Sequence, residues 1–151
     1  MYHERTTAMS QHYYRVAMNI PTDLRAKLLR KFWPTLPTIL ARSISWAYRV
    51  PASFAYPDHL QDVEVYGIHR SPRTEALLCR VGDAYFQPLA PTRPLHLTLC
   101  TAEGVPPVEA GGMDIAEAEL FARPLWFKGR LEMFALRPLA SIGQERRLAA
   151  A

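Results

Sequence analysis

Residues 95–101 (Leu-His-Leu-Thr-Leu-Cys-Thr) alternate between apolar and polar side chains, and this alternation predicts a half-buried β-strand. Leu95, Leu97 and Leu99 are expected to face a hydrophobic core. His96 and Thr98 then lie side by side on the other face, near the surface. An imidazole that titrates near neutrality beside a hydroxyl donor can hold a phosphate oxygen and move a proton at one place. The run therefore predicts a strand and also a candidate catalytic pair, His96 and Thr98.

The composition of the 151-residue chain is that of one folded domain. Hydrophobic residues make up 49% and charged residues 21%, a balance typical of a folded globular protein rather than of a disordered chain. The formal net charge of +4 mildly favours anionic partners, such as a nucleotide or RNA. No segment reaches the roughly 20 apolar residues that span a membrane, and the N-terminus has no apolar signal core. We expect a cytoplasmic protein with no membrane partner, and the sequence leaves its oligomeric state open.

Cysteine and histidine spacing argues against a metal or another cofactor. Cys79 and Cys100 each lie within an apolar run, which predicts two buried, reduced thiols rather than a disulfide. The spacing of zinc ligands is absent, as are a Gly-rich phosphate loop, a Gly-x-Ser-x-Gly elbow and a metalloprotease His-Glu pair. Four of the five histidines are expected at the surface or in the terminal arm: His3, His12, His59 and His69. We expect no metal and no cofactor, and His96 is the candidate for chemistry.

Strands dominate the rest of the chain, together with one clear helix. Apolar residues at helical spacing predict a helix over residues 24–32, which the following prolines stop. The predicted strands cover residues 13–20, 43–48, 62–68, 75–81, 95–101 and 131–136. Prolines predict an extended connection over 88–94, and a short helix is expected over 114–121. We expect an α+β fold. It divides into a flexible arm over 1–11, a single domain over 12–140 and a flexible tail over 141–151.

The run from Leu95 to Ala110 leads from the His-x-Thr strand into a loop that contains Gly104, and then into a Pro-Val-acidic-small segment. This run resembles the second His-x-Thr region of the 2H phosphoesterase superfamily, and most closely that of its LigT-like, RNA-repair-like branch. Residues 62–68 and 75–81 look like the hairpin that precedes that motif. The resemblance covers roughly residues 42–110.

The resemblance implies a two-lobed 2H-phosphoesterase-like α+β fold, with antiparallel sheets around a central groove and one long N-terminal helix. Two His-x-Thr/Ser motifs face each other across that groove. One His is a general base, the other is a general acid, and the hydroxyls bind phosphate oxygens. The implied substrates are 2′,3′-cyclic phosphates, 2′-5′ linkages or cyclic oligonucleotides, cleaved without a metal. In-line displacement at phosphorus needs a proton removed on one side and delivered on the other.

The first motif of that family aligns best with Ser43-Ile44-Ser45, so Ser43 stands where a His is expected. A serine hydroxyl can bind phosphate but cannot shuttle protons near neutral pH. The loss of one acid–base partner lowers a rate by about 10²–10⁴-fold. His69 and Tyr48 are two alternative sources of the missing group, although strand parity places Tyr48 on the core face with Ile44.

Three functions fit these features. The first is a metal-independent phosphodiesterase in which His96 is the main acid–base group beside Thr98. Its substrate-binding residues would be two serines, Ser43 and Ser45, and a nearby arginine, Arg42 or Arg80. The second is a binder that sequesters a nucleotide or RNA in the same groove without fast turnover. The third is a structural or protein-interaction domain in which His96 only stabilises the fold.

Overall fold

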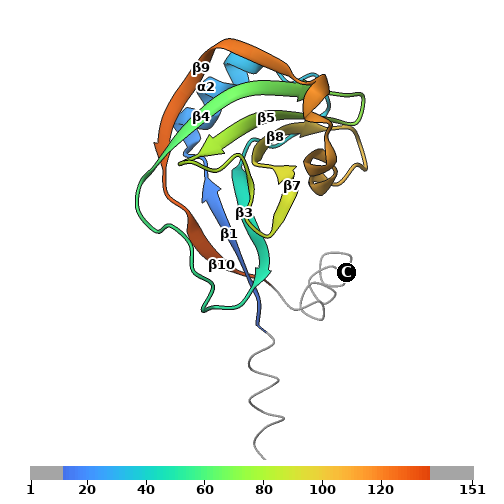
Figure 1. The fold of residues 1–151 in the computed structure, drawn as a ribbon. Coiled ribbons are helices and arrows are strands. Elements are labelled where there is room, and N and C mark those ends of the chain that lie inside the picture. The colour runs from blue at the N-terminus through green and yellow to red at the C-terminus, as the bar shows by residue number, and fades with distance from the viewer. Residues whose placement is uncertain (1–11, 137–151) are drawn as a thin grey trace, which may run out of the picture.

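The computed structural model describes residues 12–136, which form one antiparallel sheet with a few helical turns around it (Figure 1). The sheet has eight strands, and seven of them follow the order β10-β1-β3-β8-β5-β4-β9 while β2 pairs with β8. These strands are β1 (Tyr14–Asn19), β2 (Thr38–Ile39), β3 (Ser43–Val50), β4 (Gln61–Arg70), β5 (Thr74–Val81), β8 (His96–Thr101), β9 (Glu119–Gly129) and β10 (Glu132–Ala135). The expectation of an α+β fold dominated by antiparallel strands is confirmed at this level.

Four shorter elements lie outside the sheet. The strands β6 (Phe86–Gln87) and β7 (Ala90–Pro94) form a hairpin of their own, where only an extended connection was expected. Two 3-10 segments follow β8, namely η1 (Pro107–Gly112) and η2 (Ile115–Glu117). The predicted arm (1–11) and tail (141–151) lie outside the described residues, as do residues 137–140 at the end of the predicted domain.

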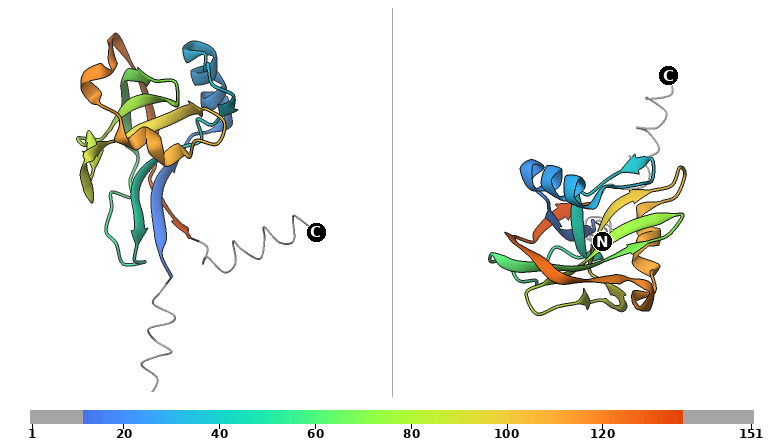
Figure 2. Two further views of the ribbon diagram at one scale, coloured as in Figure 1. Left: turned by 90° about the vertical axis from the view of Figure 1, so that its right-hand side faces the viewer. Right: turned by 90° about the horizontal axis from the view of Figure 1, so that it is seen from above.

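The helix α2 (Thr22–Phe32) has 11 residues, so a long N-terminal helix is not confirmed. Leu28 and Phe32 are buried on its apolar stripe and pack into the core. The helix ends at Phe32; the next residue, Trp33, adopts a left-handed conformation, and a proline follows it. Figures 1 and 2 show α2 on one face of the sheet and the β6–β7 hairpin on the other. The two faces are therefore a helix-covered core face and a face partly covered by the hairpin.

The pairing between neighbouring strands is shortest at the centre of the sheet. β3 and β8 share a single registered pair, Ile44 opposite Leu97, and both side chains are fully buried. β2 continues the contact along β8, where Thr38 lies opposite Thr101. On one side of this junction lie β10, β1 and β3, and on the other lie β8, β5, β4 and β9. The junction brings together two strands that are far apart in the sequence.

The strand β3 departs from simple alternation, and this corrects the expectation for Tyr48. The pairing of β3 with β1 shifts twice, so that Val16 lies opposite Ala47 whereas Ala17 lies opposite Ser45. Each shift inserts an extra residue into β3, and such a β-bulge turns the following side chains to the other face. Tyr48 is consequently 63% exposed instead of lying in the core.

The prediction of a helix over residues 114–121 is wrong for most of that range. Only η2 is helical, with the Asp114 side chain accepting a hydrogen bond from the Ala116 backbone N–H. From Glu119 the chain forms β9, which pairs with β4 along most of its length. Phe121 packs against the core from this strand. Pairing with a distant strand overrides a weak local preference for helix.

A buried carboxylate ties the end of α2 to the sheet. Glu75 of β5 is 2% exposed and accepts hydrogen bonds from the Thr35 backbone N–H (2.9 Å) and from Arg70 Nη1 (2.8 Å). Its carboxylate also accepts from the Thr35 hydroxyl and from the Cys100 thiol. Arg70 in turn donates to the Phe32 carbonyl oxygen. Cys100 and Cys79 are buried and unpaired, as predicted.

Candidate functional site

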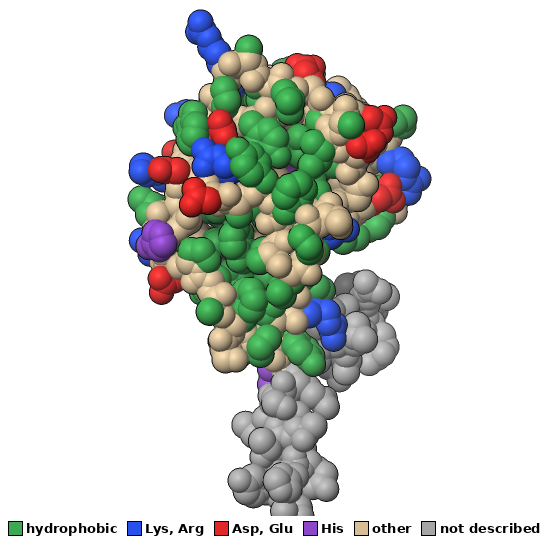
Figure 3. Space-filling view, in the orientation of Figure 1, with side chains coloured by type: hydrophobic (Ala, Val, Ile, Leu, Met, Phe, Trp, Pro, Cys, Tyr) green, Lys and Arg blue, Asp and Glu red, His purple; other side chains and the backbone are tan. Residues whose placement is uncertain are grey.

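A cavity of about 810 Å³ opens on the face of the sheet opposite α2. It lies over β3 and β8, and the β6–β7 hairpin and η1 form its sides. Figure 3 views this face and shows hydrophobic side chains gathered over its middle, with charged side chains mostly around them. The lining side chains that carry charge or hydrogen-bonding groups are Arg15, Arg42, Ser43, Ser45, Tyr48, Gln87, Arg93, His96 and Thr98.

The junction of the sheet explains why both predicted motifs reach this cavity. Ile44 and Leu97 point together into the core, and successive side chains of a strand point to opposite faces. The residues on either side of each therefore point to the cavity face, and these are the predicted site residues Ser43, Ser45, His96 and Thr98. The prediction that they share one face is confirmed.

His96 is held in one tautomer. Its Nδ1 lies 2.9 Å from the Pro94 carbonyl oxygen. A carbonyl oxygen only accepts hydrogen bonds, so Nδ1 carries the proton in the neutral ring and Nε2 carries the lone pair. Nε2 has no hydrogen-bond partner among the described residues, and His96 lines the cavity. A proton from a molecule in the cavity can therefore be accepted at Nε2.

The surroundings keep His96 uncharged. The side chain is 8% exposed, so it is more buried than the expected position near a surface. This burial lowers the pKa of His96 below 6.5; the bond to Pro94 opposes the shift, and the charge of Arg93 adds to it. An imidazole with a lowered pKa is neutral near pH 7, which is the form that a general base needs.

Arg15 is a site residue that sequence reasoning missed. It extends from β1, and its Nη2 donates to Ser43 Oγ (2.9 Å) and Ser45 Oγ (3.3 Å). The only local signal was a charged residue within the alternating first strand. The pairing of β1 with β3, which places Ala17 opposite Ser45, brings Arg15 to the cavity face. This pairing cannot be read from the spacing of residues along the chain.

Two further arginines line the cavity. Arg42, predicted as a binding residue, is exposed at its edge. Arg93 of β7 donates from Nη2 to the Val108 carbonyl oxygen (2.9 Å) and so holds η1 beside the cavity. Gly111 allows this approach, because a Cβ there would lie 2.0 Å from Arg93 Nη2. With Arg15 there are three guanidinium groups, and no lining residue is a carboxylate. The charged groups of this lining are positive, which favours an anionic ligand.

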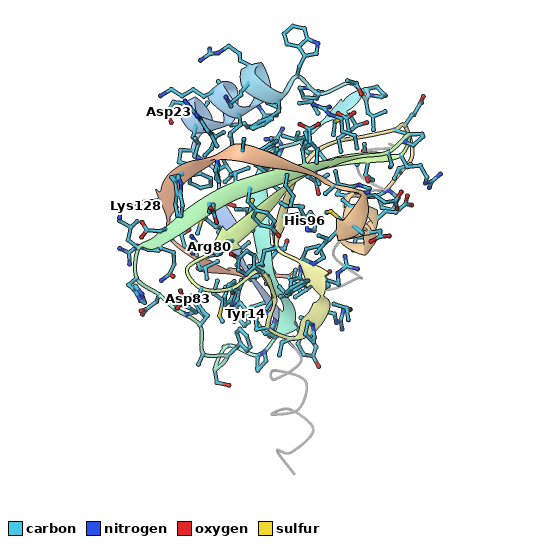
Figure 4. The ribbon with its side chains drawn as sticks, turned by 45° about the horizontal axis from the view of Figure 1, so that its top comes forward. Tyr14, Asp23, Arg80, Asp83, His96 and Lys128 are labelled. Atoms are coloured by element: carbon cyan, nitrogen blue, oxygen red, sulfur yellow. The ribbon has the colours of Figure 1, made fainter. Side chains whose placement is uncertain are left out.

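Two predicted contributors lie elsewhere. Arg80 binds Glu64 (Nε to Oε1, 3.0 Å) and stacks over the Trp126 ring at 5.1 Å. The expectation that it reaches the site is therefore wrong, and Figure 4 shows Arg80 and His96 at separate places on the sheet. His69 of β4 is buried and does not line the cavity. It cannot replace the missing histidine at position 43.

Part of the cavity lining is apolar. Its exposed members are Tyr48 of β3, Leu89 of the β6–β7 hairpin and Val108 of η1, and each side chain is more than half exposed. Large apolar side chains that stay exposed inside a concave site favour a ligand with an apolar or aromatic part. The bulge in β3 is what supplies the tyrosine. The site therefore combines cations, hydroxyls and one neutral imidazole with exposed apolar side chains.

Comparison with protein-family models, with curated proteins and with solved structures finds no match to this chain. The resemblance to the 2H phosphoesterases therefore stays a prediction. No group of three or more His, Cys, Asp or Glu side chains that could hold a metal occurs among residues 12–136. Within the same residues, α2 and the 3-10 segments are too short to cross a membrane.

Proposed function

We propose that the cavity binds a nucleotide phosphodiester and hydrolyses it, with His96 as general base. The observation that carries the proposal is the fixed tautomer of His96, whose Nε2 lone pair is available beside hydroxyls and arginines that suit a phosphate. Thr98 and Ser45 would donate to the non-bridging phosphate oxygens. Arg42 would neutralise their charge. The proposed step needs no metal ion.

The chemical step follows from the two ring nitrogens. Nε2 removes a proton from a water molecule, and the water oxygen forms a bond to phosphorus. The bond from phosphorus to the leaving oxygen breaks, and the leaving oxygen takes the electron pair. The imidazolium that results keeps its Nδ1 bond to the Pro94 carbonyl, which stabilises it. It then returns its proton to solvent.

We also propose that the domain is a 2H phosphoesterase with a degenerate first motif. Its support is the pairing of Ile44 with Leu97, which sets Ser43-x-Ser45 beside His96-x-Thr98 at the centre of the sheet. On this proposal, the two halves of the sheet on either side of this pair would be the two lobes that the resemblance implies. Both strands that carry the motifs line the cavity.

The test is a panel of 2′,3′-cyclic phosphates, 2′-5′-linked dinucleotides, cyclic oligonucleotides and dinucleoside phosphoanhydrides, assayed in EDTA so that contaminating metal-dependent enzymes are silent. We expect turnover of at least one member, lowered by about 10²–10⁴-fold in His96→Gln. Thr98→Val, which removes only the hydroxyl, weakens binding. His59→Gln is the matched control, because His59 is exposed and lies outside the cavity. Turnover that survives His96→Gln contradicts the proposal.

A second candidate function is sequestration of the same ligands without turnover. It is favoured by Ser43, which cannot carry a proton and is already held by Arg15. Tight binding with the ligand recovered intact after denaturation would support this function. If the panel shows neither binding nor turnover, the remaining hypothesis is a structural or protein-interaction domain.

A further inference from the structure

The cavity has two chemically different sides. The β8 side carries a proton acceptor, His96, whereas the β3 side carries Ser43 and Ser45, both bound to Arg15. Apart from His96 and the arginines, Tyr48 is the only titratable side chain among the described lining residues, and it is 63% exposed. The group that is held in place on the β3 side is therefore Arg15, which is a fixed positive charge rather than an acid.

This difference limits the leaving group. A guanidinium does not lose its proton in proteins, since its pKa is above about 12. Arg15 can stabilise negative charge on a leaving oxygen but cannot protonate it. An alkoxide needs that proton, and its absence lowers the rate by about 10²–10⁴-fold. A leaving phosphate is a stable anion and needs none.

The charge of the cavity also limits the kind of substrate. Three arginines line it and no carboxylate does. Among residues 12–136, Arg15 and Arg93 form no ion pair with an acidic side chain. A phosphodiester carries one negative charge, whereas the three guanidinium groups carry three positive charges. A ligand with additional phosphate charge matches the lining better.

We propose that Arg15, held by Ser43 and Ser45, stabilises the leaving group as an anion, and that the substrate is a nucleotide with a phosphoanhydride bond. The inference rests on the proposed hydrolysis by His96. Water loses a proton to His96 Nε2 and its oxygen bonds to one phosphorus. The anhydride P–O bond breaks, and the second phosphate leaves with the electron pair beside Arg15. The apolar lining side chains of Tyr48, Leu89 and Val108 would contact the base.

Two substrates with the same nucleosides test this inference in EDTA. P1,P2-di(adenosine-5′) diphosphate releases a phosphate monoester anion, whereas adenylyl-(3′→5′)-adenosine must release an alkoxide. We expect the anhydride to be cleaved about 10²-fold faster or more. Ser43→His, which introduces a proton donor on the β3 side, should narrow this ratio by raising the rate for the alkoxide substrate. Arg123→His, which introduces a histidine on β9 outside the cavity, should leave the ratio unchanged.

Arg15 variants test the role of the charge. Arg15→Ala should slow anhydride cleavage by about 10²-fold, in the range of losing one preorganised transition-state contact. Added guanidinium ion should restore part of the rate, which a merely structural role would not allow. Arg123→Ala is the matched control, because Arg123 is exposed on β9 and outside the cavity. Thermal melts of each variant establish that it is folded.

The outcomes separate the two proposals. Equal cleavage of both substrates, or an Arg15→Ala variant with full activity, overturns the inference on the leaving group. If cleavage in those cases still requires His96, the proposed function stands. Failure to cleave any ester or anhydride in the panel overturns both.

Discussion

Replacing Glu75 gives the sharpest test of the energetics of this fold. Glu75→Ala removes the acceptor of two hydrogen bonds from Thr35, one from Arg70 and one from Cys100. Hydrogen bonds to a charged group contribute about 1.5–3 kcal/mol each and are not additive. The Arg70 side chain is 39% exposed, so its share is discounted to about 1 kcal/mol or less. We expect a loss of about 3–4 kcal/mol, a large part of the roughly 5–15 kcal/mol that stabilises a domain.

The pH dependence of this loss has a definite sign. Burial raises the pKa of Glu75, but the bonds from Cys100, Thr35 and Arg70 together outweigh it and leave the pKa below 4.5. A group whose pKa is lowered on folding stabilises the fold above its unfolded pKa. That contribution is lost as the pH falls through the folded value. The difference in stability between the wild type and Glu75→Gln should therefore be constant above about pH 5 and shrink below pH 4.5.

Urea unfolding followed by tryptophan fluorescence measures both effects. At pH 7 the midpoint should fall strongly in Glu75→Ala and less in Glu75→Gln, which keeps a polar side chain of the same shape. Asp62→Asn is the matched control, because Asp62 and its partner Lys128 are both mostly exposed, and its midpoint should not move. The reasoning is refuted if Glu75→Ala unfolds at the wild-type midpoint, or if the Glu75→Gln difference grows at acid pH.

Three further outcomes follow from the site and the core. The kcat/KM for hydrolysis should rise with pH to a plateau, with the midpoint of the rise below pH 6.5, because burial lowers the pKa of His96 and its neutral form is the base; a midpoint above that pH would contradict this assignment. Gly111→Ala should displace Arg93 and weaken nucleotide binding by about tenfold in calorimetry, or about 1.4 kcal/mol. Gly112→Ala, where an added Cβ meets nothing within 4 Å, should bind like the wild type. Ile44→Ala should lower the free energy of unfolding by about 2–5 kcal/mol, because Ile44 is fully buried at the junction of the sheet; a loss below about 1 kcal/mol would mean that the junction is not part of the core.

Local patterns predicted the elements whose periodicity is strong. The helix over α2 follows from apolar residues at helical spacing, and β8 follows from the alternation around His96. Prediction failed where a partner strand decides the structure. β9 contains Pro124 and lacks a clear alternation, and only its pairing with β4 makes it a strand. No sequence pattern near Tyr48 predicts the β-bulge that turns its side chain out of the core.

The amino-acid sequence by itself determined that His96 and Thr98 lie on one face of a strand, because alternation is a property of the local backbone. It also determined that position 43 carries no proton acceptor. Only the tertiary structure decided which groups meet there, because strand order and register depend on pairings between distant segments. The pairing of Ile44 with Leu97 brought the serines to His96, and the pairing of β1 with β3 brought Arg15 to the serines.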